Sequence, residues 1–407
     1  MRIAFVSPEL HRTRGTERAS YEVMTRLATQ HDVCLFARHW EPDGKTQVCF
    51  HPVPVLRGPG LVTYLSFFLS ATWQVRRAGR RHGGFHTVYS PGPNCGQVQV
   101  STAWFCQARQ LALFRSGKHR PPPHSVMDWL KLGNRWAYAA AVTGMERLFY
   151  ASPRLRRVVS PSRLLARDLT AFYGLPEERV RVAYAGVDSE HFTPAHRAEL
   201  RERARREMDL PADRFVFFFI GNNWLIKGLF HLLRALPHVP DALLVVVGAD
   251  YERIESWRRM SEEFGVADRI RYVGRRPDIL YYYAAADALL APSVYDTFAL
   301  MPMEAMACGL PVIVSRNAGV AEIVGKDSAL VVENIEDSAE LAGAMNRIAR
   351  DSDLRARLAA SGLQLSHHHS WEEFCGAIEA ELLQTAGHHS TGGNGNGRPA
   401  PEGTLRS

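Results

Sequence analysis

The second half of the chain is dominated by short, continuous apolar runs. They comprise residues 215–220, 242–247, 270–273, 288–291, 312–314 and 329–332. Apolar runs of this length without alternation are typical of strands buried on both faces. Helical segments separate most of them, so the pattern predicts a doubly wound parallel sheet covered by helices. Ligands bind to such sheets beyond the carboxyl ends of the strands.

The first half repeats this alternation less regularly. An apolar run at 2–7 is followed by Gly15 and by a helical pattern whose apolar face comprises Ala19, Val23, Met24, Leu27 and Ala28. Further strand candidates lie at 33–37, 87–89, 97–103 and 157–160. The chain is long enough for two domains with substantial cores. We therefore expect a second α/β domain, and a cleft between two facing sheets where two substrates meet.

Basic residues are concentrated in the first half. Residues 1–165 hold 23 Lys and Arg against 8 Asp and Glu, a net charge of +15, whereas residues 166–407 hold 26 against 34, a net charge of −8. A basic half attracts an anionic membrane, a polyanionic acceptor or nucleic acid. The sequence contains no nucleic-acid-binding motif, so we expect no nucleic-acid partner and favour a membrane or acceptor. An ordinary solvated basic face is the alternative.

One segment of this basic half has two interpretations. Residues 61–75 are largely apolar, and Arg76, Arg77, Arg80 and Arg81 follow them. A helix of this kind suits the surface of an anionic membrane, with its apolar side facing the lipid. The same pattern suits a helix packed on a sheet, and both interpretations remain open. The apolar run is too short to span a bilayer.

Several features bear on metals and location. The six cysteines are scattered without a Cys-x-x-Cys pair, which favours a reducing compartment and predicts no zinc site. Asp351-Ser352-Asp353 imitates a metal-binding D-x-D motif but lies between two helices, so we expect a helix N-cap. The histidines at 367–369 lack helical metal spacing and are expected to be exposed. The chain enters a strand directly, so we expect no signal peptide. We therefore expect a cytoplasmic protein with no cofactor and no essential metal.

Two acids separated by seven residues stand out in the second half. Asp296 and Glu304 lie in Asp-Thr-Phe-Ala-Leu-Met-Pro-Met-Glu, between the apolar runs at 288–291 and 312–314. The segment is typical of a strand, a loop that opens a helix, and the next strand. A helix N-terminus offers unpaired N–H groups and a positive dipole end, which suit a pyrophosphate. The alternative is that Asp296 caps the helix and Glu304 is solvated.

This segment resembles the E-x7-E signature of the family 4 glycosyltransferases, which are retaining enzymes of the GT-B fold. The resemblance implies that the first acid, here Asp296, contacts the donor sugar, and that Glu304 holds the ribose of the nucleotide. The loop amides of Phe298, Ala299 and Leu300 would hold the diphosphate. Asp296 stands where the family has Glu, and Ala299 where it has Gly.

Other site residues follow from the same resemblance. The loop from Gly221 to Gly228 resembles the family's G-R-x5-K-G loop, with Asn222 in the place of the arginine and Lys227 as the lysine for the diphosphate. Gly15 is the kept second glycine of the family's N-terminal pair, beside the donor phosphates. The loop after Gly274, which contains Arg275, would bracket the base. We expect Asp296 and Lys227 to be catalytic, and Asp287 to buttress structure.

The resemblance also divides the chain. It implies two Rossmann-like domains, with residues 1–185 binding the acceptor and residues 186–366 the nucleotide sugar. A helix at 367–386 would cross back to the first domain, and the Gly/Asn/Ser/Pro-rich residues 387–407 are expected to be disordered. Within the family, residues 36–40 and 103–108 are most similar to the lipopolysaccharide-core heptose glucosyltransferases. Ala19 and Trp104 stand where acids near the acceptor are expected.

The expected reaction moves a sugar, with retained configuration, from a nucleotide-sugar donor to a lipid-linked or saccharide acceptor. A UDP-sugar is favoured, and the product belongs to cell-envelope glycan such as lipopolysaccharide. The basic first domain is expected to bring the enzyme to the anionic inner face of the plasma membrane. Two alternatives remain: a nucleotide-sugar-binding protein without transfer activity, and a sugar-nucleotide epimerase of the same fold.

Overall fold

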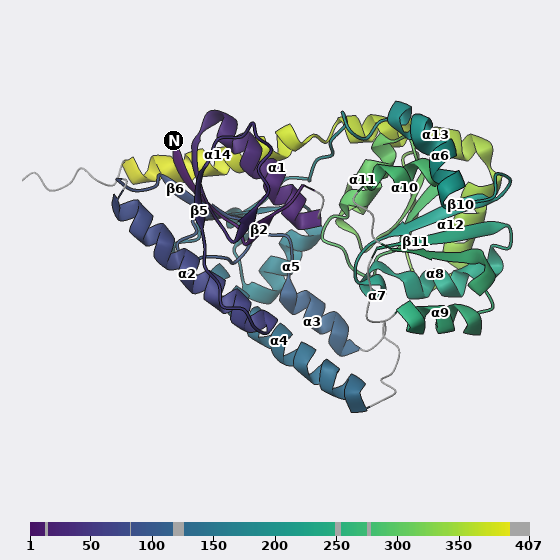
Figure 1. Cartoon of the computed structure of the whole chain (residues 1–407), viewed down its shortest axis with the longest axis horizontal. Coiled ribbons are helices and arrows are strands. Elements are labelled where there is room, and N and C mark those ends of the chain that lie inside the picture. The colour runs from purple at the N-terminus through teal and green to yellow at the C-terminus, as the bar shows by residue number, and fades with distance from the viewer. Residues whose placement is uncertain (13–14, 82, 117–125, 249–253, 275–277, 391–407) are drawn as a thin grey trace, which may run out of the picture.

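The computed structural model describes residues 1–12, 15–81, 83–116, 126–248, 254–274 and 278–390. Two α/β domains lie side by side, the first in purple to blue and the second in teal to green (Figure 1). Each is built on a parallel sheet covered by helices. Both sheets and their core helices follow the alternation of apolar runs and helical segments in the sequence.

The N-terminal domain contains a seven-stranded parallel sheet in the order β5-β3-β1-β6-β7-β8-β9. Strand β1 pairs with β3 on one side and β6 on the other. Helix α1 buries Ala19, Val23, Met24 and Leu27 against the sheet, as its apolar face predicts. The elements are β1 (Arg2–Val6), β2 (Glu9–Leu10), α1 (Gly15–Gln30), β3 (Asp32–Ala37), β4 (His39–Trp40), β5 (Cys49–Pro52), α2 (Gly60–Arg81), β6 (Thr87–Ser90), β7 (Val100–Thr102), α3 (Gln107–Ser116), α4 (Val126–Tyr150), β8 (Arg157–Ser160), α5 (Arg163–Tyr173), η1 (Glu177–Arg179) and β9 (Val180–Val182).

The C-terminal domain contains a six-stranded parallel sheet in the order β12-β11-β10-β13-β14-β15. Strands β10 and β11 are almost wholly buried, which explains their continuous apolar runs. The elements are α6 (Pro194–Glu207), β10 (Phe215–Ile220), α7 (Trp224–Lys227), α8 (Leu229–Ala235), η2 (Leu236–His238), β11 (Ala242–Val247), α9 (Ile254–Glu263), η3 (Ala267–Arg269), β12 (Ile270–Val273), α10 (Leu280–Ala285), β13 (Ala288–Ala291), α11 (Leu300–Ala307), β14 (Val312–Ser315), η4 (Gly319–Glu322), β15 (Leu330–Val332), α12 (Ser338–Arg350) and α13 (Ser352–His367).

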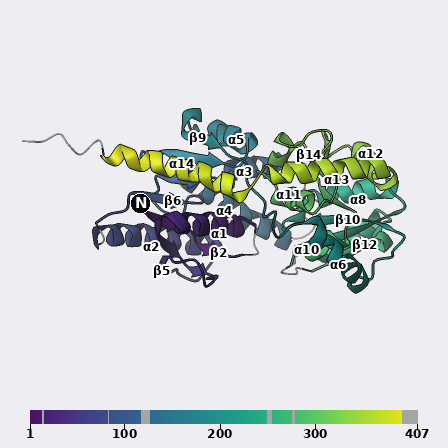
Figure 2. The same ribbon diagram turned by 90° about the horizontal axis from the view of Figure 1, so that it is seen from above.

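The chain returns to the first domain through α14 (Trp371–Ser390), which lies along α1 and the strands β6 to β8 (Figure 2). Its buried Ile378, Leu382 and Thr385 hold it there. The helix continues through residues 387–390, where disorder was expected, so that part of the prediction is wrong. Packing of the preceding turn carries the helix past Gly387. The rest of the expected disordered tail, 391–407, lies outside the described residues.

The two passages between the domains touch each other. The amide of Val187 donates to the carbonyl of His369 at 3.0 Å, and Val187 forms a β-bridge with Ser370. At the neighbouring Gly186, an added Cβ would lie 2.1 Å from the carbonyl carbon of Ser370 and 2.2 Å from the amide nitrogen of Trp371. Only glycine therefore permits the two passages to pack this closely.

Replacing Gly186 with alanine is expected to destabilise the protein by about 3 kcal/mol, because backbone must move to make room for the methyl group. The midpoint of urea denaturation measures this. Gly343→Ala is the control: Gly343 lies inside α12 with open space around its Cβ position, so the change is expected to stabilise by about 0.5–1 kcal/mol. Equal midpoints for the two variants would contradict the close packing at Gly186.

Candidate functional site

The carboxyl ends of the two sheets face each other. Thr297, in the loop between β13 and α11, donates from Oγ1 to the carbonyl of Trp104 after β7 at 2.9 Å. The hydroxyl of Ser162, after β8, donates to the carbonyl of Thr297 at 2.6 Å. Tyr295 donates to Asp168 of α5 at 2.7 Å. The β13–α11 loop (residues 292–299) is thus the point where the domains meet.

Lys227 and Asp296, the two expected catalytic residues, form an ion pair. The Lys227 ammonium donates to Oδ2 of Asp296, although 69 residues separate them. Lys227 ends α7 after β10, and Asp296 follows β13, the neighbour of β10 in the sheet. The sheet order reverses at β10, which is where doubly wound sheets bind their ligands. Their side chains are 22% and 11% exposed, so solvent screens the pair only partly.

The backbone fixes Lys227 next to the β13–α11 loop. Gly228 adopts φ +92°, and a Cβ there would lie 1.9 Å from the carbonyl oxygen of Pro292. The amide of Val294 donates to the carbonyl of Ile226 at 2.8 Å. The Lys-Gly turn therefore abuts the loop that carries Asp296, and a side chain at position 228 would separate them.

The start of α11 presents unpaired amides beside this ion pair. Among the described residues, no acceptor is found for the amides of Ala299 and Leu300. The amide of Phe298, expected to bind diphosphate as well, instead lies 3.4 Å from Oδ1 of Asp296. The loop is attached to the neighbouring segment, because Asp296 forms a β-bridge with Ala318. Two free amides at a helix N-terminus suit an anion.

Ala299 has a left-handed backbone, with φ 68° and ψ 88°, at the helix N-cap. This conformation disfavours any side chain with a Cβ. Ala299→Gly is therefore expected to stabilise the protein by up to about 1 kcal/mol, measured by the urea midpoint. Ala305→Gly in the same helix has ordinary helical geometry and is expected to destabilise by about 1 kcal/mol. A lower midpoint for Ala299→Gly than for wild type would contradict the strain.

Glu304 is buried and paired, so the alternative of a solvated helix residue is wrong. It is 8% exposed. The Tyr283 hydroxyl donates to its Oε2 and the Arg18 guanidinium to its Oε1, each at 2.8 Å. Burial raises the pKa of Glu304, and the charge of Arg18 opposes this. A ligand that binds Glu304 must therefore exchange with, or join, these two donors.

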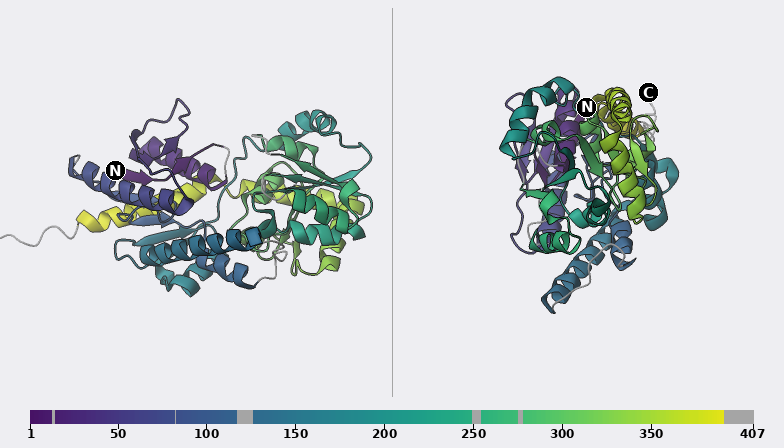
Figure 3. Two further views of the ribbon diagram at one scale, coloured as in Figure 1. Left: turned by 60° about the horizontal axis from the view of Figure 1, so that its bottom comes forward. Right: turned by 90° about the vertical axis from the view of Figure 1, so that its right-hand side faces the viewer.

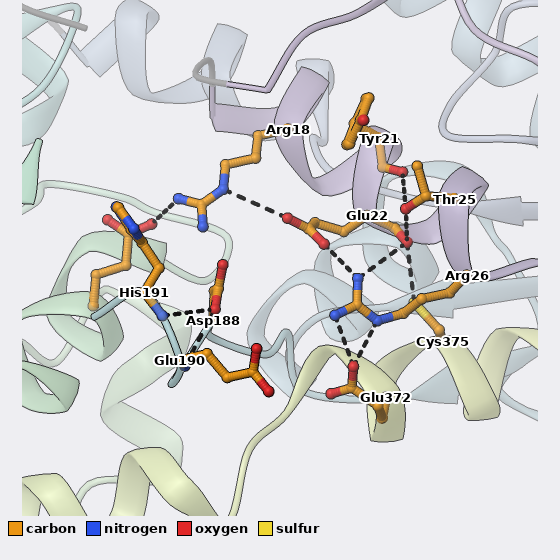
Figure 4. A network of polar contacts seen from close by, with 11 residues as sticks. Arg18, Tyr21, Glu22, Thr25, Arg26, Asp188, Glu190, His191, Glu372 and Cys375 are labelled. Atoms are coloured by element: carbon orange, nitrogen blue, oxygen red, sulfur yellow. Dashed lines mark hydrogen bonds and ion pairs between the residues drawn. The ribbon is translucent and has the colours of Figure 1, made fainter. Parts of the chain in front are cut away.

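Arg18 brings the first domain to Glu304. It lies in the first turn of α1, its guanidinium is 5.2 Å from the Phe192 ring centre, and its Nε is 3.8 Å from Glu22. Glu22 pairs with Arg26, which reaches Glu372 of α14 at 2.7 Å (Figure 4). Charged side chains thus connect Glu304 with the returning helix. The sequence did not single out Arg18 as a site residue. The one feature that could have indicated it is its position three residues after Gly15.

The remaining expected residues lie in different surroundings. Gly15 begins α1, and an added Cβ there would meet nothing within 4 Å. Asn222 is exposed in the loop after β10. Arg275 lies outside the described residues. Asp287 buttresses structure as expected, pairing with Arg201 and Arg205 and accepting from the amide of Val216.

The residues whose sequence imitates a metal-binding motif do not form a metal site in the part of the chain that the structure describes. Asp351 is the N-cap of α13 and accepts from the amide of Leu354 at 2.9 Å, as predicted. His367 and His368 are exposed, as expected, whereas His369 is half-buried, so the expectation is wrong for that residue. Within the described ranges, groups of three possible metal ligands occur only in the first domain, at His11, His39 and Glu41 and at Cys34, Cys49 and His51. Neither group includes Asp296 or Glu304.

Two family models match consecutive parts of the chain: glycosyltransferase family 4 over residues 13–191, and glycosyl transferases group 1 over residues 201–364. The D-inositol 3-phosphate glycosyltransferase of Xylanimonas cellulosilytica is 33% identical over 246 residues, which cover 58% of this chain and 58% of that protein. Its namesake from Corynebacterium jeikeium is 32% identical over 237 residues, covering 54% and 56%. The chain thus spans a little more than half the length of these relatives.

Solved structures have the same architecture. WaaG, a glycosyltransferase involved in lipopolysaccharide biosynthesis, matches with a TM-score of 0.72 and 19% identity, covering 94% of this chain and 99% of that one. Anabaena HepE in complex with UDP-glucose matches with a TM-score of 0.67 and 16% identity, covering 96% and 100%. The two family models together cover most of the chain, which therefore belongs to the family 4 glycosyltransferases. It has the two-domain GT-B fold of these solved structures.

Proposed function

We propose that the protein transfers a sugar from a nucleotide-sugar donor to an acceptor, with retained anomeric configuration. One observation carries this: Lys227 and Asp296 are paired beside the free amides of Ala299 and Leu300, where the two domains meet. A cation and two aligned N–H groups suit the diphosphate of a nucleotide sugar. The matching Anabaena structure holds UDP-glucose, which supports a UDP-sugar as the donor.

Each residue has a distinct part in this reaction. Lys227 and the two amides bind the diphosphate and stabilise the charge that develops on it as the bond between the sugar C1 and the phosphate oxygen breaks. The acceptor oxygen bonds to C1 on the face that the diphosphate leaves, which retains the configuration. Its proton passes to the departing phosphate oxygen. Asp296 orients Lys227 and a sugar hydroxyl, and Glu304 accepts from the ribose hydroxyls.

A panel of UDP-, GDP- and ADP-sugars tests this function. The purified protein is offered each donor with and without membrane extract, and nucleoside diphosphate is quantified. Release only with extract supports transfer. Donor binding without turnover would instead indicate a binding protein, and conversion of one nucleotide sugar into another would indicate an epimerase. Either of these outcomes contradicts the proposal.

The acceptor is proposed to carry phosphate. The first domain, which supplies Arg18 and the Trp104 loop to the site, belongs to the half with a net charge of +15. The curated relatives are named for D-inositol 3-phosphate, whereas the WaaG match is named for lipopolysaccharide biosynthesis. The test compares sugar transfer from the best donor to three acceptors: inositol 3-phosphate, lipopolysaccharide core and lipid extract. The acceptor that is used distinguishes a soluble phosphorylated acceptor from a saccharide or a lipid-linked one.

Contact with an anionic membrane is proposed for helix α2, on the outer side of the first domain (Figures 1 and 3). The helix packs on the domain through Phe67 and Val75, and its outer side supports the proposed contact, because Leu69 and Trp73 are 67% and 57% exposed. Beside it lies a cavity of about 640 Å³. Its lining includes the side chains of Arg76, Arg80, Arg154 and Arg156. Among the described residues, no carboxylate pairs with these four arginines. None of the described helices has the length and hydropathy to cross a bilayer.

Vesicles containing phosphatidylglycerol are therefore expected to bind the protein, and those of phosphatidylcholine alone are not. Trp73→Ser should weaken binding several-fold by removing the inserted ring, measured by co-sedimentation. Leu383→Ser on α14, where the leucine is 52% exposed, is the matched control. Raised salt should weaken binding further, because it screens the arginines. Equal sedimentation with both lipids would contradict the membrane contact.

A further inference from the structure

Two cysteines and a histidine lie together on the edge of the first sheet. Strand β5 is the edge strand and pairs with β3 in parallel, so that Cys34 lies opposite Cys49, and Phe36 opposite His51. Side chains two residues apart point to the same face of a strand. Cys34, Cys49 and His51 therefore share one face. This grouping is separate from the Lys227–Asp296 site, which lies in the other domain.

The geometry of these three side chains suits a metal. Sγ of Cys49 lies 3.3 Å from Nε2 of His51, and the three ligand atoms all lie within 4.8 Å of one another. Tetrahedral zinc with sulfur at 2.3 Å and nitrogen at 2.1 Å separates such ligands by about 3.6 Å. The Phe36 ring stacks on His51, with centroids 4.6 Å apart and planes at 11°, and so fixes the imidazole. Small movements of the two thiols would complete three corners of the tetrahedron.

We propose that Cys34, Cys49 and His51 bind one zinc ion that clips edge strand β5 to β3. Two thiolates and a neutral imidazole are the ligands that zinc prefers over harder cations. Cys34 is buried whereas Cys49 is exposed, so one side of the site is open to solvent and a water can fill the fourth position. The ion adds a second connection to a strand that has a hydrogen-bonded neighbour on one side only. Its role is structural, and sugar transfer does not pass through it.

The spacing of these residues hides the site from motif searches. Positions 34, 49 and 51 contain no Cys-x-x-Cys pair, so the sequence predicts no zinc site. Pairing of β3 with β5 creates the group, and β5 is a strand that the apolar pattern does not predict. The second group, at His11, His39 and Glu41, is less suited, because both nitrogens of His11 already contact the carboxylates of Glu9 and Glu41.

Titration of the reduced, metal-free full-length protein with Co²⁺ tests the proposal. We expect one equivalent to give a thiolate-to-cobalt charge-transfer band, and Zn²⁺ to displace it. Cys49→Ser should abolish the band and weaken Zn²⁺ binding by about 100-fold or more, since a direct ligand matters at least as much as an outer one. Cys49 is exposed, so this variant is expected to fold. Zn²⁺ should raise the thermal midpoint of wild type and not that of Cys49→Ser.

Two control variants complete the experiment. His51→Asn should also lose affinity, whereas His238→Asn, at an exposed histidine of the second domain, should bind as wild type. The exposed His367 and His368 lack thiolates, so cobalt bound there gives no charge-transfer band. A wild-type protein without this band, or a band that survives Cys49→Ser, would overturn the proposal. So would a Zn²⁺-induced shift of the thermal midpoint equal in wild type and Cys49→Ser.

Discussion

Replacing Lys227 with methionine is expected to lower kcat for sugar transfer by about 10²–10³-fold, equivalent to about 2.7–4 kcal/mol of transition-state stabilisation. Methionine keeps the length of the side chain and removes the charge that Lys227 supplies to the leaving diphosphate. Nucleoside diphosphate release under saturating acceptor measures the effect. Lys326→Met, at an exposed lysine of the same domain, is the matched control and should retain full activity.

The ion pair between Lys227 and Asp296 leads to a second prediction. Asp296→Asn should also slow transfer, and the double variant should lose far less than the product of the two single losses, because the residues act as a unit. Independent, multiplicative losses would mean that Asp296 and Lys227 serve separate purposes. Full activity in Lys227→Met would show that the diphosphate binds elsewhere.

Glu304→Gln is expected to weaken donor binding by about 10–100-fold, the effect of losing charged hydrogen bonds to the ribose. Glutamine keeps the shape of the side chain and can still accept from Tyr283. Calorimetric titration of the preferred nucleotide sugar measures the dissociation constant. Glu333→Gln, at an exposed glutamate paired with Arg316, should bind the donor as wild type.

Arg18→Gln separates two roles of Glu304. If Glu304 served only as a connection between the domains, Arg18→Gln and Glu304→Gln would change donor affinity equally. The proposal expects Arg18→Gln to keep most of the affinity, because the carboxylate remains available to the ribose.

Burial raises the pKa of Glu304. Wild-type affinity should therefore fall on acidification already above the ordinary glutamate pKa, while that of Glu304→Gln stays flatter.

The buried part of the fold follows closely from the sequence. Strands β10, β11 and β13 begin and end where their apolar runs do, because each of them is enclosed by neighbouring strands and covering helices. The edge strands β5 and β9 were missed. They are short, and most of their residues are exposed or half-buried, so no apolar pattern marks them. The apolar pattern of a sequence reveals which residues are buried, whereas these two strands form because each pairs with a neighbouring strand.

The site was predicted in its parts rather than in its connections. Lys227, Asp296 and Glu304 were each expected from short motifs. The sequence could not reveal that Lys227 pairs with Asp296, because that contact depends on the pairing of β10 with β13 within one sheet. It could not reveal either that Arg18 reaches Glu304 across 286 residues, because that contact depends on the packing of the two domains. The amide of Phe298 was assigned to the diphosphate, yet the turn at the left-handed Ala299 leaves it close to Asp296. These features depend on backbone conformation that residue types alone do not specify.

A crystal structure of the protein with bound UDP tests the central claim most directly; GDP and ADP complexes serve if UDP does not bind. The β-phosphate is predicted to lie within hydrogen-bond distance of Lys227 Nζ and of the amides of Ala299 and Leu300, with the ribose hydroxyls at Glu304. A nucleotide seated away from the N-terminus of α11, or no nucleotide bound at all, would contradict it.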